Sequence, residues 1–160
     1  MPEPPSWARS GILYLAIVVE ALLVLQYALG LWTNVYGVGL NAAGLYTSSS
    51  SGSTYSAHVD LGYLLGLLSL LIVILAALHR QARVIAQSVF LLLWIGIAGV
   101  TGRLFVTGSP NPAIDSFLMG LAFLFAFGTG IGLVVTLLRA RTTGPAAPPA
   151  GAPPAPAGSA

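Results

Sequence analysis

The sequence predicts an all-α fold, a transmembrane four-helix bundle with up-down-up-down topology. The first observation is composition: 56% of the 160 residues are hydrophobic, only 6% are charged, and the mean hydropathy is +0.89. A soluble globular domain carries about 25% charged residues, so this chain could not cover a water-facing surface. The second observation is that four apolar stretches each reach the roughly 20 residues that a membrane-spanning helix needs.

The four stretches cover, approximately, residues 11–33, 57–78, 84–106 and 113–138. Every backbone polar group in hydrocarbon must find its hydrogen bond inside the segment, so stretches of this length are predicted to be helices. The first stretch is too long for a signal peptide and has no small-residue cleavage pattern before Asn34. One transmembrane domain is therefore expected over residues 1–143.

Two further segments are predicted to lie outside the membrane without regular structure. Residues 47–56 read TSSSSGSTYS, a composition typical of a flexible polar loop. Residues 144–160 form a tail of proline, alanine and glycine, predicted to be disordered and partly extended as polyproline II. We expect this tail to be solvated rather than docked in an aromatic-lined groove of a partner.

The distribution of arginine predicts the orientation. Arginines flank the predicted helices at Arg9, Arg80, Arg83, Arg139 and Arg141. The connections 34–56 and 107–112 contain neither lysine nor arginine. Because cytoplasmic loops carry the excess of positive charge, both termini and the Arg80 turn are predicted to be cytoplasmic. The protein is then a multi-pass protein of the cell membrane.

Charge and residue types narrow the function classes. The net charge of +2 comes from six arginines and no lysine, too little for a nucleic-acid-binding surface. Without cysteine, disulfides and thiolate metal sites are excluded. The chain carries no complete catalytic or metal-binding motif, which favours a non-enzymatic protein. The expected partners are the lipid bilayer, other membrane subunits or further copies of the chain.

A weak internal repeat relates the two halves of the chain. The segment ALGLWTNVYGVG aligns with IAGVTGRLFVTG, which pairs Gly30 with Gly99, and the helices that follow pair Gly62 with Gly120. The first and third helices run in the same direction, so the halves would be parallel αα-hairpin repeats. Chance similarity between glycine-rich apolar helices is the alternative explanation.

Small residues are expected to close the bundle. Lipid provides no hydrophobic force between helices, so close backbone approach at small side chains drives their association. Gly62 and Gly66 form one small-xxx-small step, and Gly128 and Gly132 form another. Such steps could also serve a homodimer, but packing within the bundle is the default interpretation.

Polar residues inside the predicted first helix are candidate functional residues. An ionisable group in a membrane segment is costly and therefore a functional hypothesis. Glu20, near the middle of the helix, is either a neutral buried carboxyl or a proton or cation site. Gln26, Gly30 and Asn34 are spaced four residues apart and form one stripe. This stripe is predicted to hydrogen-bond to another helix.

A second polar group is predicted at the outer membrane face. His58 and Asp60 open the second helix, Arg103 closes the third, and Asp115 and Ser116 open the fourth. One interpretation is an ion-pair cluster in which Arg103 bonds Asp115 or Asp60, with the acids also favoured at helix N-termini. The other is a small outward-facing pocket for a lipid headgroup, a quinone or a haem propionate.

Haem binding is a further hypothesis, because four-helix membrane bundles with histidine are common hosts for it. His58 and His79 are separated by about 31 Å at 1.5 Å per residue, so they cannot ligate the same iron. Haem b on His58 would need Met119 as its second ligand, or His58 of a second chain. Met119 lies about one turn deeper than the expected ligand position.

Four segments resemble known membrane proteins: LLVLQYALGLWTNVY, AHVDLGYLLGLL, IAGVTGRLFVTG and IDSFLMGLAFLFAF. Together they are similar to a family of small four-pass membrane proteins of bacteria and archaea that has no assigned activity. A more distant resemblance is to one half of the haem A synthase and b-type cytochrome bundles, whose even-numbered helices carry ligand histidines. The present chain has His58 on its second helix but Ser116, which is not a haem ligand, at the corresponding place on its fourth.

Three functions are consistent with these features. The first is a non-enzymatic accessory subunit of a larger membrane complex, or a small homo-oligomer. The second is a haem- or quinone-associated redox subunit built on His58. The third is a small transporter or channel that uses Glu20 and the stripe from Gln26 to Asn34.

Overall fold

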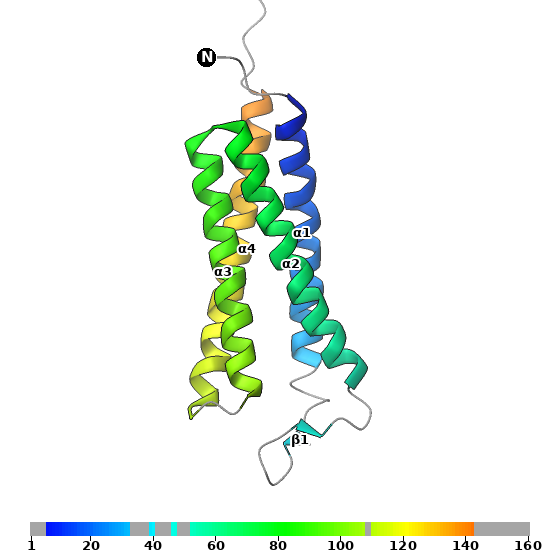
Figure 1. The fold of residues 1–160 in the computed structure, drawn as a ribbon. Helices are drawn as coiled ribbons and strands as arrows, with labels where there is room; N and C mark the ends of the chain where they lie inside the picture. The colour runs from blue at the N-terminus through cyan, green and yellow to red at the C-terminus, as the bar shows by residue number, and fades with distance from the viewer. Residues whose placement is uncertain (1–5, 33–38, 41–45, 48–51, 108–109, 143–160) are drawn as a thin grey trace, which may run out of the picture.

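A computed structural model describes residues 6–32, 39–40, 46–47, 52–107 and 110–142 of the chain. Its elements are α1 (Ser6–Trp32), β1 (Gly39–Leu40), β2 (Tyr46–Thr47), α2 (Gly52–His79), α3 (Ala82–Val106) and α4 (Pro112–Thr142). The four helices form an antiparallel bundle (Figure 1). All four are long and apolar enough to cross a membrane, which confirms the predicted fold class.

The helices extend beyond the apolar stretches that predicted them. α1 begins at Ser6, α2 begins at Gly52, and α4 continues to Thr142. The prediction of an irregular loop was therefore wrong for residues 52–56, which form the first turns of α2. Hydropathy detects only the part of a helix that lies in hydrocarbon, whereas backbone hydrogen bonding continues past it. Asn34 and the 144–160 tail lie outside the described residues.

The two ends of the bundle differ in charge. The start of α1, the α2–α3 turn and the end of α4 lie together and carry Arg9, Arg80, Arg83 and Arg139; we call this the arginine end (Figure 1). The opposite end, the hairpin end, carries the α3–α4 connection and the short antiparallel pair β1–β2. Arg80 closes the α2–α3 turn with a φ of 60° and donates its backbone N–H to Ala76 O at 3.0 Å.

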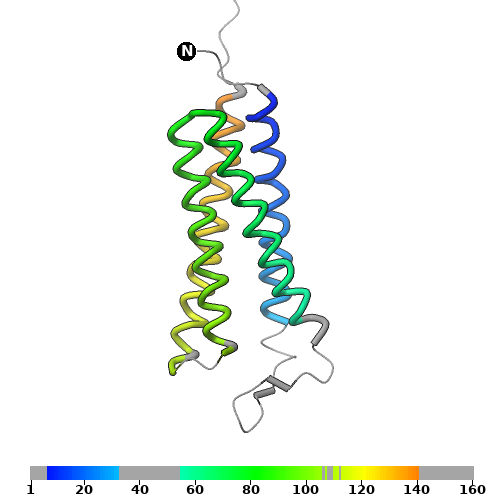
Figure 2. The backbone as a smooth tube through the Cα atoms, viewed as in Figure 1, coloured from blue at the N-terminus to red at the C-terminus, as the bar shows by residue number. Residues whose placement is uncertain are grey.

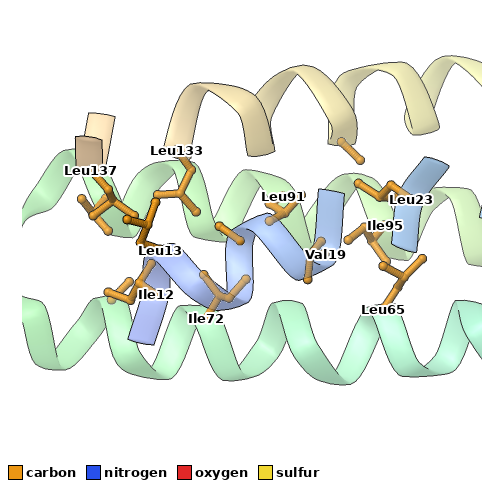
Figure 3. Packing of buried hydrophobic residues seen from close by; sticks show 14 residues of the cluster. Ile12, Leu13, Val19, Leu23, Leu65, Ile72, Leu91, Ile95, Leu133 and Leu137 are labelled. Atoms are coloured by element: carbon orange, nitrogen blue, oxygen red, sulfur yellow. The ribbon is translucent and has the colours of Figure 1, made fainter. Parts of the chain in front are cut away.

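Buried residues follow a helical repeat on each helix. On α2 they are Leu65, Ser69, Ile72 and Ala76, and on α3 they are Val84, Ser88, Leu91 and Ile95. This spacing of four, three and four residues aligns one stripe of each helix with the bundle axis, as in coiled-coil-like packing. Ser69 and Ser88 satisfy their hydroxyls within their own helices, by donating to Gly66 O and Val84 O. Figure 3 shows the apolar members packed between the helices.

The outward faces of the helices are as apolar as the core. Large side chains such as Leu67, Phe117 and Leu124 are more than 60% exposed. A helix that is hydrophobic all round is typical of a membrane span. Lipid contact therefore accounts for this surface.

The apolar core lies closer to the arginine end. Among the described residues, the last buried apolar side chains toward the hairpin end are Leu23, Leu65, Ile95 and Ala122. Figure 2 shows the α1/α2 pair diverging from the α3/α4 pair in this direction. In the hairpin-end half, Gln26 and His58 pack within the α1/α2 pair.

Candidate functional site

The polar side chains within the bundle pack over glycines of neighbouring helices. We call such a position a glycine notch: a long side chain from another helix lies within 3.4 Å of the position that a Cβ would take. Five glycines form notches in the described residues. His58 lies over Gly30, Gln26 over Gly62, Met119 over Gly102, Glu20 over Gly130, and Gln87 over Gly132. The missing Cβ allows a polar or bulky group to lie against the facing backbone.

Two notches join α1 to α2 reciprocally. Gln26 lies over Gly62, and His58 lies over Gly30 with its Cε1 3.1 Å from the position of a Cβ. Each helix thus offers one polar side chain and, one turn later, one glycine. The two side chains meet, with Gln26 Nε2 3.4 Å from His58 Nε2. The amide can donate to this ring nitrogen when His58 carries its proton on Nδ1. The polar stripe of α1 therefore meets α2 at His58.

The contact between Gln26 and His58 leaves two atoms without partners. Gln26 Oε1 and His58 Nδ1 are both buried and have no hydrogen-bond partner in the structure. Removing one member of the pair would add another unsatisfied group, which typically costs about 1–3 kcal/mol. Both members are thus needed for the α1–α2 contact.

We expect Gln26→Leu and His58→Leu each to lower the free energy of unfolding by about 1 kcal/mol, because each leaves the other group unpaired. The double variant should cost less than the two singles combined. Unfolding in mixed micelles with increasing SDS, followed by tryptophan fluorescence, measures all three. Fully additive losses would show that the two side chains act independently.

The predicted outer cluster stays a prediction, and its members differ in burial. Arg103 and Asp60 are exposed, and His58 packs against Gln26. Asp115 is buried in the first turn of α4, where its Oδ2 has no hydrogen-bond partner. The predicted ion pair of Arg103 with Asp115 is therefore not formed through this buried oxygen. Ser116 is half-buried.

The haem candidates lie in different helix pairs. Met119 Sδ is 3.1 Å from the position of a Cβ on Gly102, so this side chain belongs to the α3–α4 contact. His58 belongs to the α1–α2 contact, where its Nε2 faces Gln26. The residues present do not fit an iron held between His58 and Met119.

Glu20 occupies the notch between α1 and α4. A Cβ on Gly130 would overlap the Glu20 carboxyl group, so α4 accepts this side chain only because residue 130 is glycine. Both carboxyl oxygens are buried, and neither has a hydrogen-bond partner in the structure. Glu20 is thus an unpartnered acid enclosed by apolar helices.

The face of α1 that carries Glu20 contacts α4 along its length. Toward the arginine end, Arg9 Nη2 donates to Leu137 O at 2.9 Å. Toward the hairpin end, Tyr27 stacks on Phe123 with ring centroids 5.1 Å apart. Spacings of eleven and seven residues on α1 are close to three and two whole turns, which places Arg9, Glu20 and Tyr27 on one face.

Gln87 is a site residue that the sequence did not single out. Its Nε2 lies 3.2 Å from the position of a Cβ on Gly132, and its Oε1 is buried without a partner. Trp94, seven residues later on α3, stacks on Phe125 of α4 at 4.8 Å. The sequence signal that could have identified Gln87 was an amide side chain inside an apolar stretch, as for Gln26.

Five other glycines of the described residues have open space where a Cβ would lie: the half-buried Gly66 on α2 and four exposed glycines. Gly96 and Gly99 on α3, and Gly120 and Gly128 on α4, are exposed, and nothing lies within 4 Å of a Cβ placed on them. In the predicted repeat, Gly99 and Gly120 correspond to the notch glycines Gly30 and Gly62. The surroundings of these paired positions therefore differ, and the repeat itself stays a prediction.

Comparison with known proteins finds no family model, curated protein or solved structure that matches the chain. The resemblances to small four-pass membrane proteins and to haem-binding bundles stay predictions. The fold and the notches rest on the geometry of this chain.

Proposed function

We propose that the protein is a non-enzymatic membrane subunit that associates with other transmembrane helices, in a larger complex or with its own copies. The observation that supports this proposal is that its glycines fall into two groups with different surroundings. Five lie against a side chain of another helix. Of the five with open space at the Cβ position, Gly66 on α2 is half-buried, whereas the four exposed ones, Gly96, Gly99, Gly120 and Gly128, lie on α3 and α4. We call these four the open glycines.

The open glycines provide what helix association in lipid requires. Lipid tails are as apolar as leucine, so apolar surface alone gives no reason for two helices to meet. A glycine lets a second helix approach to backbone contact, where dispersion and weak Cα–H···O contacts accumulate. The bundle is already closed by the occupied notches, which leaves the open glycines available to a partner helix.

The predicted orientation is part of this proposal. Four of the five described arginine side chains lie at one end of the bundle, and only Arg103 lies toward the other. The positive-inside rule then places the arginine end in the cytoplasm. A partner on α3 and α4 would pack within the membrane.

The test is association of the full chain in lipid bilayers. We expect Gly99→Leu and Gly128→Leu to weaken association about tenfold, or about 1.4 kcal/mol, because the leucine side chain keeps the two backbones apart. Energy transfer between labelled copies measures self-association, and the mass of the gently solubilised particle shows whether another subunit is bound.

Ala86→Leu is the matched control, because Ala86 is also exposed on α3 but is not one of the open glycines. It should leave association unchanged. A wild-type chain that stays single in bilayers and co-purifies with nothing would contradict the proposal, as would leucine variants that associate like the wild type.

A further inference from the structure

Among the residues that the structure describes, Glu20 has no counter-ion. On its own helix, Arg9 and Tyr27 lie on the same face, at axial distances of about 16 Å and 10 Å. α4 has no ionisable side chain between Asp115 and Arg139, and α3 has none between Arg83 and Arg103. On α2 the only such group between Asp60 and His79 is Tyr63, which is 69% exposed. A charge on Glu20 would therefore be uncompensated.

The position of Glu20 over Gly130 favours a small ligand for the carboxyl group. An isolated carboxylate is strongly disfavoured outside water unless it is paired. A metal cation would need several oxygen ligands, and the group that faces Glu20 is Gly130, which has no side chain. A proton neutralises the carboxyl without any further ligand. The geometry therefore favours a proton over a metal ion.

The packing around Glu20 differs toward the two ends. Toward the arginine end, α1 contributes Leu13 and Ala16 and α4 contributes Leu133 and Leu137, all buried (Figure 3). Toward the hairpin end, the buried residues are Leu23 on α1 and the smaller Ala126 and Ala122 on α4. Beyond them the α1–α4 contact is the stack of Tyr27 on Phe123, and Tyr27 is 52% exposed. The side chains that separate Glu20 from water are therefore smaller on this side.

We propose that Glu20 is a proton-binding site, loaded from the hairpin end, in which the bound proton keeps α1 closed on α4 at Gly130. Loss of the proton leaves a carboxylate that must draw in water, which separates α1 from α4 on the hairpin side of the notch. The site does not depend on the association proposed above, because it lies inside one chain.

The first measurement is infrared spectroscopy of the full chain in phosphatidylcholine vesicles. We expect the carbonyl band of a protonated carboxyl, shifted in D₂O and lost in Glu20→Gln. The sequence contains only two glutamates, Glu3 and Glu20, so in a Glu3→Gln chain ¹³C-glutamate labels Glu20 alone. A shift of the band by this label identifies Glu20 even if Glu20→Gln does not fold. Asp115→Asn, which removes the other buried carboxyl of the described residues, is the matched control and should keep the band.

The second measurement tests the direction of loading. In vesicles whose protein orientation is known from protease accessibility, an alkaline jump at the hairpin end should remove the band at least tenfold faster than the same jump at the arginine end. Equal rates, or a faster response at the arginine end, would overturn loading from the hairpin end. A wild-type chain without the band, or a Glu20→Gln chain that retains it, would overturn the proton site. Neither measurement depends on association of the chain, so failure of the proton site can be distinguished from failure of the association proposed above.

Discussion

Gly130→Ala is expected to destabilise the bundle by about 1–3 kcal/mol, the usual cost of adding a methyl group to a packed interior. The added Cβ would overlap the Glu20 carboxyl, which is enclosed between α1 and α4 and has no described partner toward which to move. The carboxyl must then leave the notch, or the two helices must separate. Unfolding in mixed micelles with increasing SDS, followed by tryptophan fluorescence, measures the loss.

Gly128→Ala provides the comparison on the same helix. Nothing lies within 4 Å of a Cβ at Gly128, so this variant should retain wild-type stability or gain slightly from the better helix propensity of alanine. Combining Gly130→Ala with Glu20→Ala should recover much of the loss, because the smaller side chain frees the notch. Equal losses for Gly130→Ala and Gly128→Ala would show that Glu20 does not occupy the notch.

The number and order of the helices could be predicted because each apolar run is long enough to span the membrane by itself. Their ends could not, since α2 begins at Gly52, within a serine-rich segment that hydropathy assigns to a loop. Arg80 lies between two such runs, and its turn was predicted where the structure has it. The length of an apolar run thus predicts which residues cross the membrane, whereas backbone hydrogen bonding determines where the helix begins and ends.

Side-chain partners were harder to predict for a different reason. A helix that is apolar on every side carries no stripe that reveals which face turns inward. The contact of His58 with Gly30 and Gln26, which the rotation of α2 produces, was therefore not predicted. The same uncertainty made Met119 a candidate haem ligand. In the structure its side chain packs against Gly102. The signal available in the sequence was the presence of glycines together with polar side chains within the apolar segments.

Leu133→Ala is expected to lower the free energy of unfolding by about 2 kcal/mol, at the lower end of the usual cost of Leu→Ala in a core. Leu133 is fully buried between the helices, so the deleted atoms leave a space that neither lipid nor water can fill (Figure 3). The cost is at the lower end because an unfolded helix in lipid still keeps its leucine in an apolar solvent. Denaturation by SDS, with Trp94 stacked on Phe125 as one fluorescent reporter, measures it.

Leu124→Ala separates packing from hydrophobicity in this prediction. Leu124 lies on the same helix and is 61% exposed, so lipid chains can fill the space that its side chain leaves. If the bundle is held by packing, Leu124→Ala should cost less than about 0.5 kcal/mol, as surface substitutions usually do. Equal losses for the two leucines would show either that the α4 face carrying Leu124 is covered by another helix or that Leu133 faces lipid. Gentle solubilisation of both variants distinguishes these cases, because a covering helix adds to the mass of the particle.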